Sequence, residues 1–313
     1  MTTSDALDIR VQRLAATDDG IQLQVVTWGD VASPAPGATA VLAIHGVTAN
    51  ARAFDGIAGA LAPERPVVAF DLRGRGGSDV PTADPALFGP ERHVRDAIHV
   101  LDALGLAQVD VIGWSLGAAI GLCLAARHPE RVRSLALLDP GLTESSELAR
   151  ASLATVQQRL TRQYSSMDAA LEMLRNGPAL AGCDADAIAA FLRADLQEDA
   201  DGSGTVRHVM TLETLTAERE SSRPALTALV PLIECPVLIL RATDPLLTPG
   251  DNLLSAEDAA RAVTLFRRGN GTASQAQTMD IAGTNHYTIA LGIPQGTIAA
   301  LQGFMAQADV ANA

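Results

Sequence analysis

The chain has 313 residues, and its 36 acidic residues outnumber its 23 basic ones, which gives a formal net charge of −13. A surface this acidic repels phosphate backbones and anionic lipid, which argues against nucleic-acid and membrane partners. The hydrophobic content of 48% argues against a disordered chain. At about 150 residues per domain, the length allows two units or one large α/β domain with an insertion.

All 23 basic residues are arginines, because the sequence contains no lysine. This excludes a P-loop lysine, a kinase lysine and a Schiff-base lysine. The three cysteines, Cys123, Cys183 and Cys235, are far apart and fit neither a disulfide framework nor a zinc site. No N-terminal signal peptide and no apolar run of about 20 residues is present, so we expect a cytoplasmic protein.

The N-terminal part of the chain predicts a β-hairpin, because apolar and polar residues alternate over 8–28 around a turn at 18–20. After a loop at 32–39, short apolar runs alternate with segments of helical periodicity. The predicted strands are 41–44, 67–70, 109–112, 135–138, 237–240 and 277–281, and a closing helix is expected near 294–306. Strands that are apolar on both faces and separated by helices predict a mostly parallel sheet covered by helices on both faces.

This alternation stops between Leu142 and Pro231, where the apolar residues have only helical spacing. We therefore expect a core domain formed by 1–141 and 232–313. The intervening 142–231 is predicted to form a helical cap over the carboxyl edge of the sheet. The alternative is that these are ordinary packing helices.

The strongest chemical signal is Gly113-Trp114-Ser115-Leu116-Gly117, which lies between the strand 109–112 and a predicted helix at 118–127. A nucleophile on so sharp a strand-to-helix turn needs a strained backbone and small flanking residues. Ser115 would then sit at a helix N-terminus, where free N–H groups favour developing negative charge.

A serine nucleophile needs a base and an acid that orients the base. His286 follows the last predicted strand, whereas the other five histidines lie on predicted helices, in the cap or before the nucleophile strand. Two acids leave strands at the same edge, Asp244 after 237–240 and Asp139 after 135–138. We assign Asp244 as the acid, with Asp139 as its competitor.

The order Ser115, Asp244, His286 resembles the α/β-hydrolase superfamily, specifically its capped, esterase-like serine hydrolase branch. Two further motifs carry the resemblance: His45-Gly46-Val47 after one strand, and the D-x-R-G-x-G-x-S turn from Asp71 to Ser78 after the next. The resemblance implies an oxyanion hole formed by the backbone N–H groups of Val47 and Leu116. It also implies that the side chain of His45 braces the oxyanion loop and that the turn from Asp71 to Ser78 has a structural role.

The sequence also suggests roles for residues next to the proposed triad. Trp114 and Tyr287, the neighbours of Ser115 and His286, are candidate substrate-binding residues. Arg241 departs from the family, where glycine is common, and it could tune Asp244 or point outward. No metal or cofactor is expected, since no H-E-x-x-H or C-x-x-C motif occurs.

The residues point to a small-molecule substrate, most simply a small to medium, largely apolar carboxylic ester or lactone that is hydrolysed through an acyl-enzyme on Ser115. A serine at this position argues against dehalogenase and epoxide hydrolase relatives, which use a carboxylate nucleophile. The same triad would also serve carbon–carbon bond hydrolysis or cofactor-free haloperoxidase (perhydrolase) chemistry. A ligand receptor with a retained triad is a further alternative, and the sequence does not indicate an oligomeric state.

Overall fold

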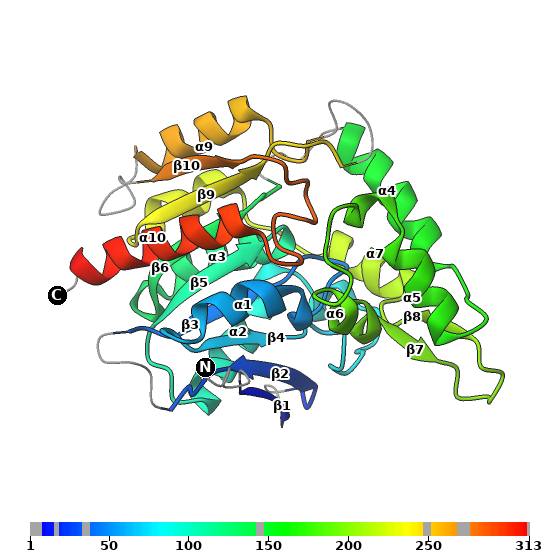
Figure 1. Cartoon of the computed structure of the whole chain (residues 1–313). Helices are drawn as coiled ribbons and strands as arrows, with labels where there is room; N and C mark the ends of the chain where they lie inside the picture. The colour runs from blue at the N-terminus through cyan, green and yellow to red at the C-terminus, as the bar shows by residue number, and fades with distance from the viewer. Residues whose placement is uncertain are drawn as a thin grey trace, which may run out of the picture.

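The computed structural model describes residues 8–15, 19–32, 38–141, 147–246, 252–267 and 276–311. Its centre is an eight-stranded sheet with the strand order β1-β2-β4-β3-β5-β6-β9-β10 (Figure 1). The strands are β1 (Ile9–Ala15), β2 (Gln22–Trp28), β3 (Val41–Ile44), β4 (Val67–Phe70), β5 (Val109–Trp114), β6 (Val132–Leu138), β9 (Val237–Ala242) and β10 (Gln277–Ile281).

The strand pairing confirms the predicted hairpin and parallel sheet. β1 pairs antiparallel with β2, and β2 pairs antiparallel with β4, whereas the other neighbours in the sheet are parallel. The carboxyl ends of the six strands from β4 to β10 therefore lie at one edge. Asp18 of the predicted turn, and 33–37 of the predicted loop, fall outside the described residues.

Helices cover both faces of the sheet because side chains alternate along each buried strand. In β3, Leu42 and Ile44 pack into the hydrophobic cluster that includes α2, α3 and α9, whereas Val41 and Ala43 pack into the cluster that includes α1 and α10. The helices are α1 (Asp55–Leu61), α2 (Pro90–Ala103), α3 (Leu116–Arg127), α9 (Ala256–Arg267) and α10 (Gln295–Ala311), with short 3-10 helices at η1 (Ala51–Phe54), η2 (Pro85–Leu87), η3 (Pro129–Arg131) and η5 (Val230–Leu232). In the described part of the chain, no helix is both long and apolar enough to span a membrane.

Residues 142–231, which we call the inserted segment, connect the adjacent strands β6 and β9 and are described from residue 147 onward. Figure 1 shows this segment, mostly in green, gathered on one side of the sheet. Its elements are α4 (Glu147–Leu160), α5 (Met167–Arg175), η4 (Pro178–Leu180), α6 (Ala189–Ala194), β7 (Leu196–Glu198), β8 (Val206–His208), α7 (Leu212–Glu220) and α8 (Leu226–Leu229).

The expectation of a purely helical insertion is wrong at one place. Leu196 pairs with His208 in a small antiparallel sheet of β7 and β8. Strands of three residues are too short to show a period of two, and the loop between them contains Gly202 and Gly204 at positive φ. Residues 199–205, between β7 and β8, thus form a hairpin loop.

Candidate active site

The strand-to-helix turn at Ser115 has the strained geometry that the glycine spacing predicts. Ser115 lies between β5 and α3 with φ 56° and ψ −113°, a region that non-glycine residues rarely adopt. A Cβ atom on Gly113 would lie 2.4 Å from the Gly117 carbonyl oxygen, and one on Gly117 would lie 1.9 Å from the Ile44 carbonyl oxygen. Both glycines are therefore required by close backbone approach. The helix begins at Leu116, earlier than expected, and Ser115 is its N-cap residue.

The loop after β3 passes directly beside the nucleophile. A Cβ atom on Gly46 would lie 3.3 Å from the Cβ atom of Ser115. His45 holds this loop, since its Nδ1 lies 2.8 Å from the Gly46 carbonyl oxygen and its Nε2 accepts the Leu72 N–H at 3.0 Å. Burial lowers the pKa of His45 to about 3, so the ring is neutral and provides one donor and one acceptor. The geometry matches the expected bracing role of His45.

The turn from Asp71 to Ser78 is organised around one buried carboxylate. Asp71 accepts hydrogen bonds from the Ala51 N–H (2.7 Å), the Gly77 N–H (2.8 Å) and the Gln24 side-chain amide (2.9 Å). A Cβ atom on Gly76 would lie 2.1 Å from Asp71 Oδ2. Burial raises the pKa of Asp71 to about 6 despite these donors. All of these contacts are internal, as expected of a scaffold turn.

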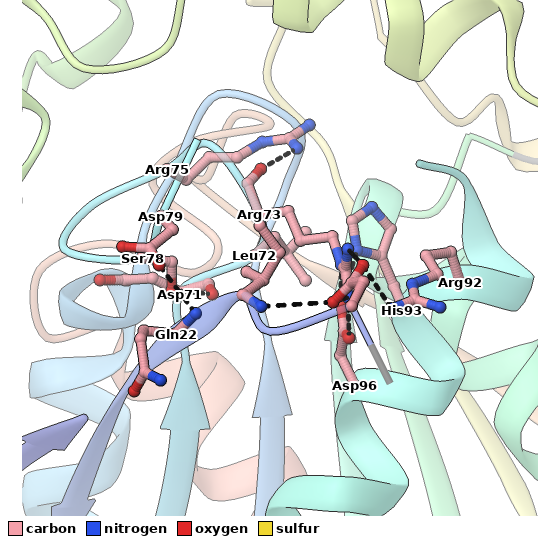
Figure 2. A network of polar contacts seen from close by, with 12 residues as sticks. Gln22, Asp71, Leu72, Arg73, Arg75, Ser78, Asp79, Arg92, His93 and Asp96 are labelled. Atoms are coloured by element: carbon pink, nitrogen blue, oxygen red, sulfur yellow. Dashed lines mark hydrogen bonds and ion pairs between the residues drawn. The ribbon is translucent and has the colours of Figure 1, made fainter. Parts of the chain in front are cut away.

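Two arginines leave this turn in different directions, as Figure 2 shows. Arg73 points toward α2, where its Nη2 donates to Asp96 Oδ1 at 2.7 Å. Arg75 donates from Nε to the Val47 carbonyl oxygen at 3.1 Å and from Nη2 to Glu218 Oε2 at 2.9 Å. Because Glu218 belongs to α7, Arg75 links the inserted segment to the loop that carries Val47.

Glu218 is the carboxylate that neutralises this buried site. Its Oε2 also lies 2.8 Å from Nε2 of His93 on α2, and the side chains of Glu218, His93 and Arg75 are almost completely buried. Burial by itself would raise the pKa of Glu218, but His93 and Arg75 hold the pKa below its usual range. An ionised Glu218 thus connects α7 to both the turn and α2.

Substituting Glu218→Gln is expected to lower the free energy of unfolding by about 3 kcal/mol, because it leaves a buried guanidinium without its counter-charge. Urea denaturation followed by circular dichroism measures the change. The control is Glu220→Gln on the same helix, an exposed position that is expected to shift stability by less than about 0.5 kcal/mol. Equal stability of the two variants would contradict the structural role of Glu218.

The imidazole of His286 is oriented by Asp139 rather than by Asp244. Nδ1 of His286 lies 2.7 Å from Oδ2 of Asp139. Asp139 directly follows β6, has φ 42° and is 1% exposed, and its other carboxylate oxygen accepts the Ala242 N–H at 3.2 Å. The buried carboxylate is thus fixed by the neighbouring strand and presents one oxygen to the histidine.

The assignment of Asp244 as the orienting acid is therefore wrong in this structure. Asp244 is exposed, its Oδ1 accepts from the Thr243 hydroxyl at 3.0 Å, and its N–H donates to the Thr284 carbonyl oxygen at 2.8 Å. It lies two residues beyond the end of β9, whereas Asp139 is adjacent to the end of β6, the strand beside β5. Both acids precede a proline after a strand, so no local signal in the sequence separates them.

Arg241 is engaged away from Asp244. It faces Asp280 across the β9–β10 pair, and its Nε donates to Asp280 Oδ1 at 2.8 Å. This cross-strand ion pair accounts for the arginine that departs from the family pattern.

Trp114 and Tyr287 form an aromatic group with His286. The Trp114 indole N–H donates to the His286 carbonyl oxygen at 2.8 Å, and each of the three ring pairs has a centroid distance of 5.8 Å. Trp114 directly precedes Ser115, so this bond holds the histidine loop against the nucleophile turn. The structure shows this positioning contact, and substrate binding by Trp114 and Tyr287 stays a prediction.

Comparisons with known proteins support the fold. A family model for the alpha/beta hydrolase fold matches residues 39–171. The chain is 50% identical over 74 residues (24% of the chain) to a 2-hydroxymuconate semialdehyde hydrolase of Pseudomonas putida, and 42% identical over 97 residues (31% of the chain) to a pimeloyl-(acyl-carrier protein) methyl ester esterase of Neisseria meningitidis. These matches span only 26% and 28% of the two relatives.

The solved structures extend the likeness over nearly the whole chain. The crystal structure of E-2-(acetamidomethylene)succinate hydrolase superposes with a TM-score of 0.76 at 22% identity and covers 96% of this chain and 100% of that one. At this identity the likeness establishes the fold, which the family model and the turn at Ser115 support independently. The chain has the α/β-hydrolase fold, and residues 39–171 match the family model for it.

Proposed function

We propose that this protein is a serine hydrolase that cleaves a carboxylic ester or lactone through an acyl-enzyme on Ser115. The observation that carries the proposal is the 2.7 Å contact between His286 Nδ1 and the buried Asp139 carboxylate, at the sheet edge where Ser115 sits on its strained turn. A nucleophile, a base and an orienting acid thus leave three strands of one sheet, β5, β10 and β6.

The proposed mechanism follows from where each proton lies. The Asp139 carboxylate accepts from Nδ1 of His286, which leaves the lone pair on Nε2 free to take the Ser115 proton. The serine oxygen attacks the carbonyl carbon, and the N–H groups of Val47 and Leu116 stabilise the oxyanion. His286 then gives the proton to the leaving alcohol, and a water activated in the same way releases the acid from Ser115.

The inserted segment serves as a cap in this proposal. Val156 and Leu160 of α4 share a hydrophobic cluster with Val47 of the oxyanion loop. The cap is therefore in contact with the loop that would bind the oxyanion, and it is anchored to the same loop through Arg75 and Glu218. Closing the site in this way would exclude water from the reacting carbonyl group.

Carbon–carbon bond hydrolysis is the second candidate function. The 50% identity over 74 residues to a semialdehyde hydrolase favours it, whereas the similarity to a methyl ester esterase favours ester cleavage. Both reactions use a serine, a histidine base and an oxyanion hole, so the geometry described above serves either.

A substrate panel with an active-site probe tests the proposal. The native protein is incubated with 4-nitrophenyl esters, γ- and δ-lactones and 1,5-diketones, and separately with a fluorophosphonate whose site of attachment is determined by mass spectrometry. Turnover of esters or lactones with labelling of Ser115 supports the first function, and turnover of diketones alone supports the second. Absence of labelling at Ser115 would contradict both.

A further inference from the structure

Arg159, near the end of α4, has a buried guanidinium edge without a partner. Its Nε and Nη2 atoms are buried and make no hydrogen bond to any residue that the structure describes. The groups that interact with the guanidinium most strongly are Tyr287, Asp195 and Tyr164. An arginine keeps its charge under all ordinary conditions, so this edge is a buried cation with two unused donors.

The position of Arg159 places this edge beside the candidate active site. Residues three and four apart share one face of a helix, so Val156, Arg159 and Leu160 lie together on α4. Val156 and Leu160 belong to the hydrophobic cluster that also includes Val47 of the oxyanion loop, and Arg159 interacts with Tyr287 of the histidine loop. This face of α4 therefore lies near both the oxyanion loop and the histidine loop.

Asp195, a carboxylate that interacts with the Arg159 guanidinium, is already hydrogen-bonded to another side chain. Asp195 Oδ2 lies 2.8 Å from Nδ1 of His208, whose Nε2 in turn lies 3.3 Å from the Tyr164 hydroxyl. This buried set of three side chains lies next to Arg159 and leaves its Nε and Nη2 without a hydrogen bond.

Other arginines of this protein show what the Nε–Nη2 edge binds. In Arg73, Arg133 and Arg241, these two atoms contact both oxygens of one carboxylate, on Asp96, Asp110 and Asp280 respectively. This side-on pairing matches the two parallel N–H bonds of the guanidinium to the two oxygens of a carboxylate. Arg159 has the same edge, and no carboxylate of the described chain is hydrogen-bonded to it.

We propose that Arg159 binds a carboxylate of the substrate, so that the compound cleaved at Ser115 carries a second, anionic group in addition to its reacting carbonyl. The inference rests on the proposed function and narrows its substrate class. It replaces the expectation of a largely apolar substrate, which came from overall composition and net charge. Arg159 would select the substrate carboxylate by direct contact, although the net negative charge of the protein repels anions at long range.

Matched neutral and anionic esters test the proposal by kinetics. Monomethyl esters of C5–C8 dicarboxylic acids carry the charge on the acyl side, and ω-acetoxy carboxylates of the same lengths carry it on the alcohol side. Methyl alkanoates and alkyl acetates are the neutral counterparts. We expect wild type to prefer the anionic ester in at least one series, and Arg159→Gln to reduce kcat/KM for that ester by about 10- to 100-fold, the range for a lost hydrogen bond to a charged group.

Two variants make the kinetic test specific. Arg162→Gln removes an exposed cation from the end of the same helix, where its Nη1 contacts Met173, and is expected to leave the preference unchanged. Arg159→Lys retains the positive charge but lacks the two parallel N–H donors of the guanidinium. It is expected to give a preference for the anionic ester between those of wild type and Arg159→Gln. In Arg159→Gln, turnover of neutral esters is expected to stay within about threefold of wild type, because the reacting groups are untouched.

Binding without turnover separates this inference from the proposed function. Calorimetric titration of Ser115→Ala with monomethyl adipate and with methyl hexanoate measures the same preference when no reaction occurs, and the double variant with Arg159→Gln is expected to lose it. Retention of binding preference with no esterase activity in wild type would contradict the proposed function alone. Equal preferences in wild type and Arg159→Gln, in kinetics and in binding, would overturn the role of Arg159.

Discussion

Substituting Ser115→Ala is expected to lower kcat for ester hydrolysis by about a million-fold, the loss found when a serine nucleophile is removed from such a triad. The fold should survive, since alanine removes only the hydroxyl and leaves the Gly113 and Gly117 contacts that shape the turn. The measurement is the steady-state rate on the best substrate of the panel, with the purity of the variant checked by mass spectrometry.

A matched control for this variant is Ser203→Ala, an exposed serine in the β7–β8 loop, which is expected to retain full activity. Residual activity within tenfold of wild type in Ser115→Ala would show that another group attacks the substrate. In that event the strained φ of Ser115 would need a different explanation.

Substituting Asp139→Asn is expected to lower kcat by about 10,000-fold, because an amide does not hold the imidazole with the proton on Nδ1. Asp244→Asn is the matched control, and its kcat is expected to stay within about threefold of wild type, since among the described residues only Thr243 is hydrogen-bonded to its exposed carboxylate. Both variants replace an aspartate by asparagine, and both aspartates follow strands that end at the same edge of the sheet. Comparing their kcat values therefore isolates the effect of the contact with His286.

The stability of the Asp139→Asn variant must be measured in parallel, because Asp139 Oδ1 also accepts the Ala242 N–H. Thermal unfolding distinguishes a lost fold from a lost orientation. A loss of activity in Asp244→Asn with full activity in Asp139→Asn would contradict the assignment from the structure and restore the assignment made from sequence.

The sheet was largely predictable because its central strands are apolar on both faces. The predicted runs 41–44, 67–70 and 277–281 coincide with β3, β4 and β10, and the other three strands are found with ends shifted by up to three residues. The β7–β8 pair was missed, since its three-residue strands carry no period. Helix α9 was not predicted, although its apolar residues have helical spacing.

The nucleophile turn and the histidine loop were also predictable, because each depends on a local pattern. Gly113 and Gly117 lie within one five-residue segment where close backbone contacts require glycine, and His286 lies five residues after the end of β10. The orienting acid was not predictable. Asp139 is distinguished from Asp244 by its left-handed φ and its bond to Ala242, which depend on packing between β6 and β9.

The sequence by itself determined the alternation of buried strands and helices, the place of Ser115 on its turn and the absence of lysine chemistry, because each of these depends on residue types and short-range spacing. Only the tertiary structure decided that Asp139 meets His286, that Glu218 neutralises Arg75 and that Arg159 keeps two buried donors without a hydrogen bond to any described residue. The first two contacts join residues more than a hundred positions apart, and the third feature is the lack of a hydrogen-bond partner. The local spacing of residue types predicts neither.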